Sequence, residues 1–304
     1  MVAPAVEPAG RGPAAGPGRT MSGLLIFGRT GQVARELQQL APGLALGRDA
    51  ADLAQPGACA AAIQAHRPRA VINAAAYTAV DRAEAQEDLA TAINGAAPAE
   101  MALACAALNI PLVHISTDYV FAGTGHRPWA PGDMAQPANA YGRSKWAGEE
   151  GIRASGCTHA ILRTSWVFSA HGANFVKTML RLSDTRDQIS VVDDQIGGPT
   201  PARAIAAACL AIAEQLQDAP EKTGTYHFSG APDASWCAFA RAIFRQAARP
   251  TRVQAISTSA YPTPAARPLN SRLECNTTTS VFGLARPDWH AGLKECLTQL
   301  GVST

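Results

Sequence analysis

The chain has 304 residues, of which 47% are hydrophobic and 16% charged, and its formal net charge at pH 7 is +2. This length and composition are typical of a water-soluble folded protein with one large domain or two modest ones. The near-neutral charge argues against a nucleic-acid partner, and the absence of a long apolar run argues against a membrane span or a secretory signal.

Residues 1–20 are mostly Ala, Pro, Gly and Val, so we expect a disordered tail and a folded part that begins near Met21. From residue 22 onward, short apolar runs alternate with helical stretches, which is typical of a parallel sheet covered on both faces. Strands are predicted at 24–27, 44–46, 70–75, 111–116, 160–167 and 225–228, and helices at 32–40, 56–66, 83–89, 96–108, 141–155 and 202–217. This order predicts an α/β fold with a Rossmann-like, doubly wound parallel sheet.

The first predicted strand runs into a glycine-rich turn, Gly28-Arg29-Thr30-Gly31-Gln32-Val33-Ala34. Gly28 allows a sharp turn, Gly31 lets backbone amides approach a pyrophosphate, and Ala34 lets the helix pack closely on the sheet. The spacing is looser than the standard dinucleotide fingerprint, but its position between the first strand and first helix predicts a dinucleotide site.

The end of the second predicted strand bears on the choice of nicotinamide cofactor. An acidic residue there binds the ribose hydroxyls, whereas a basic residue accommodates the extra phosphate of NADPH. Arg48, together with Arg29, favours NADPH; Asp49 would suit NADH, and solvated arginines are the alternative. Asp52 and Leu53 follow as candidates to contact the adenine ring.

Three side chains further along the chain indicate carbonyl reduction. Tyr141 and Lys145 share one face of a predicted helix, and a nearby ammonium favours the phenolate form of the tyrosine. A tyrosine tuned in this way can protonate a carbonyl oxygen, to which Thr117 would also donate a hydrogen bond. Tyr and Lys at this spacing also occur on solvated helices, so the pair alone does not decide the function.

Six sequence blocks, in this order, resemble the dTDP-4-dehydrorhamnose reductases, a family of extended short-chain dehydrogenase/reductases. They are FGRTGQV (27–33), NAAAYTAVD (73–81), STDYVF (116–121), YGRSK (141–145), RTSWVF (163–168) and RPLNS (267–271). The resemblance covers the chain from about residue 21 to about residue 300.

The resemblance implies reduction of the 4-keto group of dTDP-4-dehydrorhamnose by NADPH or NADH, the last step of dTDP-L-rhamnose synthesis. Tyr141 would then donate the proton, Lys145 would hold the nicotinamide ribose, and Thr117 would orient the keto sugar. The family's cofactor contacts fall on Gly31, Gln32, Val33, Asp52, Leu53, Ala76, Tyr77, Thr78, Tyr141 and Lys145, to which the glycine turn and strand ends add Gly28, Arg29, Arg48 and Ala75. Its sugar-nucleotide contacts fall on Thr117, Asp118 and Trp166.

The resemblance also predicts two interleaved domains. Residues 22–170 and about 202–230 would form the NAD(P)-binding Rossmann domain, and about 171–201 with 231–304 a smaller α/β domain that binds the sugar nucleotide. In that part a helix is expected to open at 174–180, residues 193–200 form a loop, and residues 261–268 are too rich in proline for regular structure. Arg267 and Arg272 are candidates to meet the diphosphate, with surface arginines as the alternative.

Some members of the family bind Mg²⁺ between subunits through glutamates. Glu36 matches one of these, but the second would lie just after residues 199–201, where this chain has Ala202 and Arg203. We therefore expect no metal requirement for the chemistry, while Mg²⁺ binding and a monomer or homodimer stay open. The seven cysteines lack metal-ligand spacing and predict reduced thiols in a cytoplasmic protein.

Two other functions stay open at this point. One is a different sugar-nucleotide epimerase or reductase of the same superfamily; a dehydratase would need Asp-Glu after the active-site Thr, whereas here Asp118 is followed by Tyr119. The other is a non-enzymatic regulatory subunit resembling the methionine adenosyltransferase beta subunit, which would keep the same fold.

Overall fold

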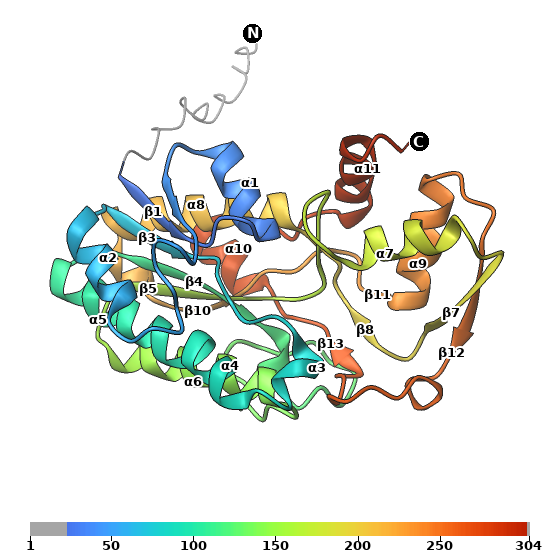
Figure 1. The fold of residues 1–304 in the computed structure, drawn as a ribbon, viewed down its shortest axis with the longest axis horizontal. Coiled ribbons are helices and arrows are strands. Elements are labelled where there is room, and N and C mark those ends of the chain that lie inside the picture. Colours follow the sequence, from blue (N-terminus) through green and yellow to red (C-terminus); the bar gives the residue numbers. More distant parts are fainter. Residues whose placement is uncertain (1–22, 303–304) are drawn as a thin grey trace, which may run out of the picture.

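The centre of the molecule is a six-stranded parallel sheet in the order β10-β5-β4-β3-β1-β2 (Figure 1). The computed structural model describes residues 23–302, so the predicted tail at 1–20 and the start at Met21 lie outside the described residues. The strands are β1 (Leu24–Phe27), β2 (Leu44–Leu46), β3 (Ala70–Asn73), β4 (Leu112–Thr117), β5 (His159–Thr164) and β10 (Gly224–His227). All neighbouring strands pair in parallel, which confirms the doubly wound fold.

Helices cover both faces of this sheet, which is why its central strands are continuous apolar runs. On one face, α1 (Gln32–Leu40), α8 (Ala202–Asp218) and α10 (Asn276–Phe282) pack in one apolar core. On the other, α2 (Ala58–His66), α5 (Ala97–Leu108) and α6 (Ala140–Ala154) form a second core. None of the described helices is long and apolar enough to cross a membrane.

A smaller group of elements has an apolar core of its own, on the right of Figure 1. It contains α7 (Phe175–Ser183), α9 (Trp236–Gln246), α11 (Trp289–Gln299) and the parallel pair β7 (Gln188–Val192) and β12 (Arg252–Ile256). Two small sheets accompany it. One is formed by β8 (Ile196–Gly197), β11 (Ala234–Ser235) and β13 (Asn270–Ser271), and the other by β6 (Val167–Phe168) and β9 (Thr200–Pro201). The loop predicted at 193–200 therefore includes β8.

Three predicted elements differ from the structure. The helix at 83–89 is wrong: α3 (Val80–Ala83) and α4 (Glu87–Thr91) are separated by a turn. The helix at 96–108 is preceded by a π-helical turn, η1 (Ala92–Ala96), that continues from α4. The strand at 160–167 ends at Thr164, because Trp166 adopts a left-handed backbone conformation with φ of 50°, which interrupts extended structure.

A buried ion pair fixes helix α6 to the sheet. Arg163 on β5 donates to Glu149 through Nε at 2.9 Å and Nη2 at 2.6 Å, and the two side chains are 1% and 0% exposed. Ser116 on β4 donates to the same carboxylate at 2.6 Å. Because α6 also carries Tyr141 and Lys145, this contact sets the position of both side chains relative to the ends of β4 and β5.

Arg163→Met should leave the Glu149 charge buried with its main partner gone. We expect the free energy of unfolding to fall by about 3–5 kcal/mol, measured by urea denaturation. Arg143→Met is the matched control, because Arg143 pairs with Glu87 on the surface at 2.7 Å. It should cost no more than about 1 kcal/mol. Equally small losses in both variants would contradict the anchoring role of the buried pair.

Candidate active site

A cleft of about 1210 Å³ lies at the carboxyl ends of β1 to β5. The strand order reverses between β1 and β3, and doubly wound sheets bind ligands at such a reversal. The residues that the sequence assigns to catalysis, cofactor and substrate line this one cleft, except the two diphosphate candidates Arg267 and Arg272. The sequence blocks are therefore brought together in space, while the role of each residue stays a prediction.

The glycine turn fits the backbone of the neighbouring strand end. Gly28 has φ of 106°, and a Cβ there would lie 3.2 Å from the backbone of Ala74 and Ala75. The Ala74 amide also donates to the Phe27 carbonyl at 2.9 Å, which holds the two strand ends together. Helix α1 begins after Gly31 without a capping side chain, so its first amides are available to an anion.

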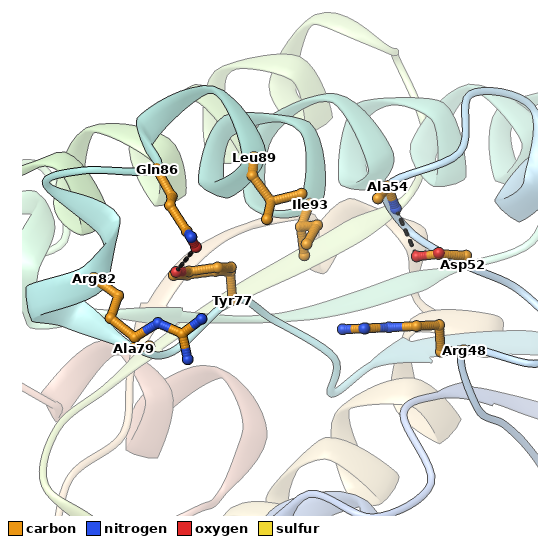
Figure 2. A pocket seen from close by; sticks show the side chains of 9 residues that line it. All are labelled: Arg48, Asp52, Ala54, Tyr77, Ala79, Arg82, Gln86, Leu89 and Ile93. Atoms are coloured by element: carbon orange, nitrogen blue, oxygen red, sulfur yellow. Dashed lines mark hydrogen bonds between the residues drawn. The ribbon is translucent and has the colours of Figure 1, made fainter.

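A side pocket of about 330 Å³ adjoins the end of β2 (Figure 2). Figure 2 shows the guanidinium groups of Arg48 and Arg82 pointing toward it from two sides, with Leu89 and Ile93 as its apolar wall. The Tyr77 hydroxyl donates to Gln86 at 2.7 Å at one end. The pocket thus combines an apolar surface with two positive charges. The sequence does not predict that Arg82, Leu89 and Ile93 line a pocket, because it does not show which side of their helices faces the cleft.

Arg29 and Asp49 form an ion pair at the mouth of the cleft. Their side chains are 2.9 Å apart and are 50% and 64% exposed. The carboxylate is therefore already paired with a guanidinium, whereas Arg48 extends toward the side pocket (Figure 2).

Tyr141 lies in the first turn of α6, which is capped by the Asn139 side chain accepting from the Gly142 amide at 2.8 Å. Its spacing from Lys145 predicts a pKa lowered by the lysine charge. In the structure burial is the larger influence and raises the pKa of Tyr141 to about 12, while a hydrogen bond with Thr117 acts in the opposite direction. At neutral pH the side chain is thus a protonated phenol.

Lys145 is buried and makes its contacts with β4. Its Nζ donates to the Ile115 carbonyl at 2.7 Å and lies 3.0 Å from Nε2 of His114. Burial lowers the pKa of Lys145 to about 8, although the Glu149 charge acts in the other direction. His114 is a site neighbour that the sequence did not single out.

Asp118 offers a polar group that the protein leaves unused. Its Oδ1 accepts from the Thr117 hydroxyl at 3.1 Å, whereas its buried Oδ2 has no hydrogen-bond partner. Burial raises the pKa of this carboxyl to about 6, although the neighbouring Ser271 and Thr117 hydroxyls act in the opposite direction. The Thr164 hydroxyl at the end of β5 is also buried without a partner, so both groups are available to the hydroxyls of a ligand.

Trp166 leaves the end of β5 in its left-handed conformation and stacks on Trp236. The ring centroids are 3.7 Å apart and the planes differ by 12°. Such backbone strain persists only where surrounding packing imposes it, and it is concentrated at functional sites. The stack thus joins the cleft to α9 of the smaller group of elements.

Asn94 is another residue of the site that the sequence did not single out. Its Oδ1 accepts from the Tyr77 amide at 2.8 Å, and its Nδ2 donates to the Tyr77 carbonyl and the Ser144 hydroxyl at 3.0 Å each. It therefore fixes the Tyr77 loop to helix α6. Asn94 lies in the π-helical turn, which hydrophobic periodicity does not reveal.

The two arginines considered for a diphosphate are held by other protein groups. Arg267 pairs with Asp81 at 2.7 Å. Arg272 donates to Asn270 at 3.0 Å and lies 3.9 Å from Asp233. Neither is among the described residues that line the cleft.

The surroundings of Glu36 do not fit a magnesium ion. This buried carboxylate lies 3.5 Å from Arg203 and 3.6 Å from His171, which are cationic or potentially cationic partners rather than oxygen ligands. Within residues 23–302, no three His, Cys, Asp or Glu side chains gather as a metal site would require.

The chain matches a known protein family over nearly its whole length. The family model described as RmlD substrate binding domain matches residues 21–302. A dTDP-4-dehydrorhamnose reductase of Sinorhizobium fredii is 41% identical over 287 residues, covering 91% of this chain and 97% of that protein. The chain belongs to the dTDP-4-dehydrorhamnose reductase family.

Solved structures of dTDP-4-dehydrorhamnose reductases have the same fold as this chain. The protein from Clostridium acetobutylicum has a TM-score of 0.85 and 34% identity, covering 91% of this chain and 99% of that one. The protein from Bacillus anthracis, in complex with NADP, has a TM-score of 0.84 and 34% identity, covering 91% and 98%. The predicted family is thereby confirmed.

Removal of divalent metal should leave the reductase rate unchanged. Glu36 is already balanced by cationic side chains, and no described metal cluster adjoins the cleft. We expect the same rate of substrate-dependent NADPH oxidation before and after dialysis against EDTA, with Mg²⁺ added back as the control. A complete loss that Mg²⁺ restores would contradict this expectation.

Proposed function

We propose that this protein reduces the 4-keto group of dTDP-4-dehydrorhamnose to give dTDP-L-rhamnose, with a nicotinamide dinucleotide as hydride donor. The observation that carries the proposal is the convergence of Tyr141, Lys145 and Thr117 on one cleft that also contains the glycine turn. The identity of the sugar nucleotide comes from the family. The cleft contains the acid, Tyr141, in a groove large enough for a dinucleotide.

The residues of the cleft fit a dinucleotide. When bound, this cofactor supplies a hydride to the carbonyl carbon. Gly28 leaves space where a side chain would meet the next strand, and the uncapped amides of α1 face the position of a pyrophosphate. The side pocket beside Arg48 suits the adenosine end, and Lys145 would hold the nicotinamide ribose.

Tyr141 is the proton donor in this proposal. Its raised pKa keeps the phenol protonated, so the proton is available to the carbonyl oxygen as negative charge develops there. The Thr117 hydroxyl adjoins both Tyr141 and Asp118 and would orient the same oxygen. Asp118 would accept from a sugar hydroxyl, and the Trp166 indole would lie against the sugar nucleotide.

The two proposed binding functions correspond to separate apolar cores of the chain. We assign cofactor binding to the six-stranded sheet with its helices, and sugar-nucleotide binding to the group around α7, α9 and α11. The stack of Trp166 on Trp236 links the two at the cleft, which supports this assignment.

Tyr141→Phe tests the proposed acid, because the substitution removes only the hydroxyl. In a coupled assay that forms the keto sugar from dTDP-glucose, we expect NADPH oxidation to fall at least about 100-fold. Tyr226→Phe is the control, since this hydroxyl donates to the Lys222 carbonyl at the sheet edge, away from the cleft. Unchanged NADPH oxidation in Tyr141→Phe would rule out the assignment of the acid.

The cofactor preference depends, in our proposal, on the free charge of Arg48. Arg48→Ala should raise KM for NADPH roughly 10-fold and leave KM for NADH nearly unchanged, because only NADPH carries the additional phosphate. Arg69→Ala is the control, since Arg69 is exposed at the amino end of β3. Equal changes of both KM values in Arg48→Ala would show that Arg48 does not discriminate between the cofactors.

A further inference from the structure

His114 is a titratable side chain that lies beside Lys145 and has no part in the proposed mechanism. His114 on β4 is 0% exposed. Its Nε2 is 3.0 Å from Nζ of Lys145, and its Nδ1 is 3.0 Å from Nδ2 of Asn73 at the end of β3. The imidazole thus connects a strand end of the cleft with the lysine.

The hydrogen bonds of Asn73 determine which imidazole nitrogen carries the proton. The Ala75 amide donates to Oδ1 of Asn73 at 3.1 Å, so the carboxamide oxygen faces Ala75 and the nitrogen faces His114. An amide nitrogen can only donate, and Nδ1 of His114 must therefore accept. Because a neutral imidazole has one N–H group, its proton is on Nε2.

The position of this proton has a consequence for Lys145. Nε2 of His114 points its N–H group at Nζ, and only an uncharged amine has a lone pair that can accept it. The same amine still donates to the Ile115 carbonyl at 2.7 Å. The groups thus form one directed chain of hydrogen bonds, from the Ala75 amide through Asn73, His114 and Lys145 to the Ile115 carbonyl.

We propose that His114 is a positioning residue that favours the neutral-amine form of Lys145 against β4, with Asn73 fixing the tautomer that does so. The proposal rests on the proposed role of Lys145 in the reductase. A ligand hydroxyl that accepts from Nζ would favour the ammonium form, which takes its extra proton from solvent. The positive charge would then appear beside Tyr141 when the cleft is filled.

The surroundings of Lys145 and His114 also favour the uncharged form of each. Burial is the largest influence on both groups: it lowers the pKa of Lys145 and holds that of His114 well below its usual value, with His159 on β5 as a further titratable neighbour of His114. Glu149 on α6 opposes this, but Arg163 and Arg153 already bind its carboxylate. Of the other titratable neighbours, Tyr141 is held protonated by burial, and the Asp118 carboxyl on η2 (Asp118–Val120) acts on Tyr141.

The chain of hydrogen bonds ends at both sides on backbone groups, an amide and a carbonyl. Neither end can release or take up a proton at neutral pH, so a proton that Lys145 takes up from the cleft cannot leave through His114 and Asn73. Its role is therefore to fix the position and charge of Lys145 rather than to pass protons.

The charge of Lys145 can be measured directly because the chain has four lysines, Lys145, Lys177, Lys222 and Lys294. We would label the protein with [ε-¹³C]lysine, assign Lys145 from the Lys145→Arg variant, and titrate the cofactor-free protein by NMR. Lys145 should titrate at or below about 8. A Lys145 midpoint near the ordinary lysine value of ~10.4 would overturn the proposal.

Three variants separate the action of His114 from burial alone. His114→Leu removes the donor and should raise the Lys145 midpoint by roughly one unit or more, whereas His114→Gln retains a side-chain N–H donor and should keep it low. Asn73→Asp, nearly identical in shape, offers His114 an acceptor, so the tautomer reverses and the midpoint should rise. Because the added carboxylate charge also raises the midpoint, the ¹⁵N shifts of the His114 imidazole are measured beside it to read the tautomer.

Asn73→Asp also decides the matter if His114→Leu does not fold. A midpoint that stays at its original value in Asn73→Asp would overturn the proposal. The titration needs no substrate, so its failure is distinct from a failure of the reductase assay with Tyr141→Phe.

Discussion

The geometry of the site depends on how closely helix α6 approaches the elements around it. Gly142 and Gly148 make this approach feasible, because a Cβ at these positions would lie 2.2 Å from the Tyr119 carbonyl oxygen and 2.1 Å from that of Asn94. The Glu149 and Arg163 pair then ties the same helix to β5. A helix that carries an acid and an amine is thereby pressed against the strand ends, where Lys145 is fully buried and Tyr141 is partly buried at the cleft.

This burial changes the chemistry of the helix in a specific way. Burial disfavours the charged form of each group, so it raises the pKa of the Tyr141 phenol and lowers that of the Lys145 ammonium. The two pKa values, which ordinarily lie close together, therefore move apart. The site thus places an uncharged phenol beside a weakly basic amine. A charge that develops on either group interacts strongly with the other, because the groups are shielded from water.

The sequence was sufficient for the order of strands and helices along the chain and for many of the residues that line the cleft. Apolar runs such as β1 and β4 are visible as such, and Gly28, Thr117 and Tyr141 occur at strand ends or helix starts that a doubly wound fold brings together. Other features depend on contacts between distant segments. The left-handed Trp166 is imposed by packing on Trp236, and the π-helical turn at Asn94 by close contact with α6. The contact of Lys145 with His114 follows from packing between a helix and a strand, which helical spacing alone cannot show.

The late position of the last sheet strand in the chain has a consequence for folding during synthesis. Edge strand β10 and helix α8, which covers one face of the sheet, both follow β9 in the chain. A growing polypeptide that has completed β5 therefore still has an unpaired sheet edge and an uncovered apolar face, two features that favour aggregation. During synthesis this sheet cannot be completed until residues 202–227 have left the ribosome, and an isolated amino-terminal half would keep both surfaces exposed.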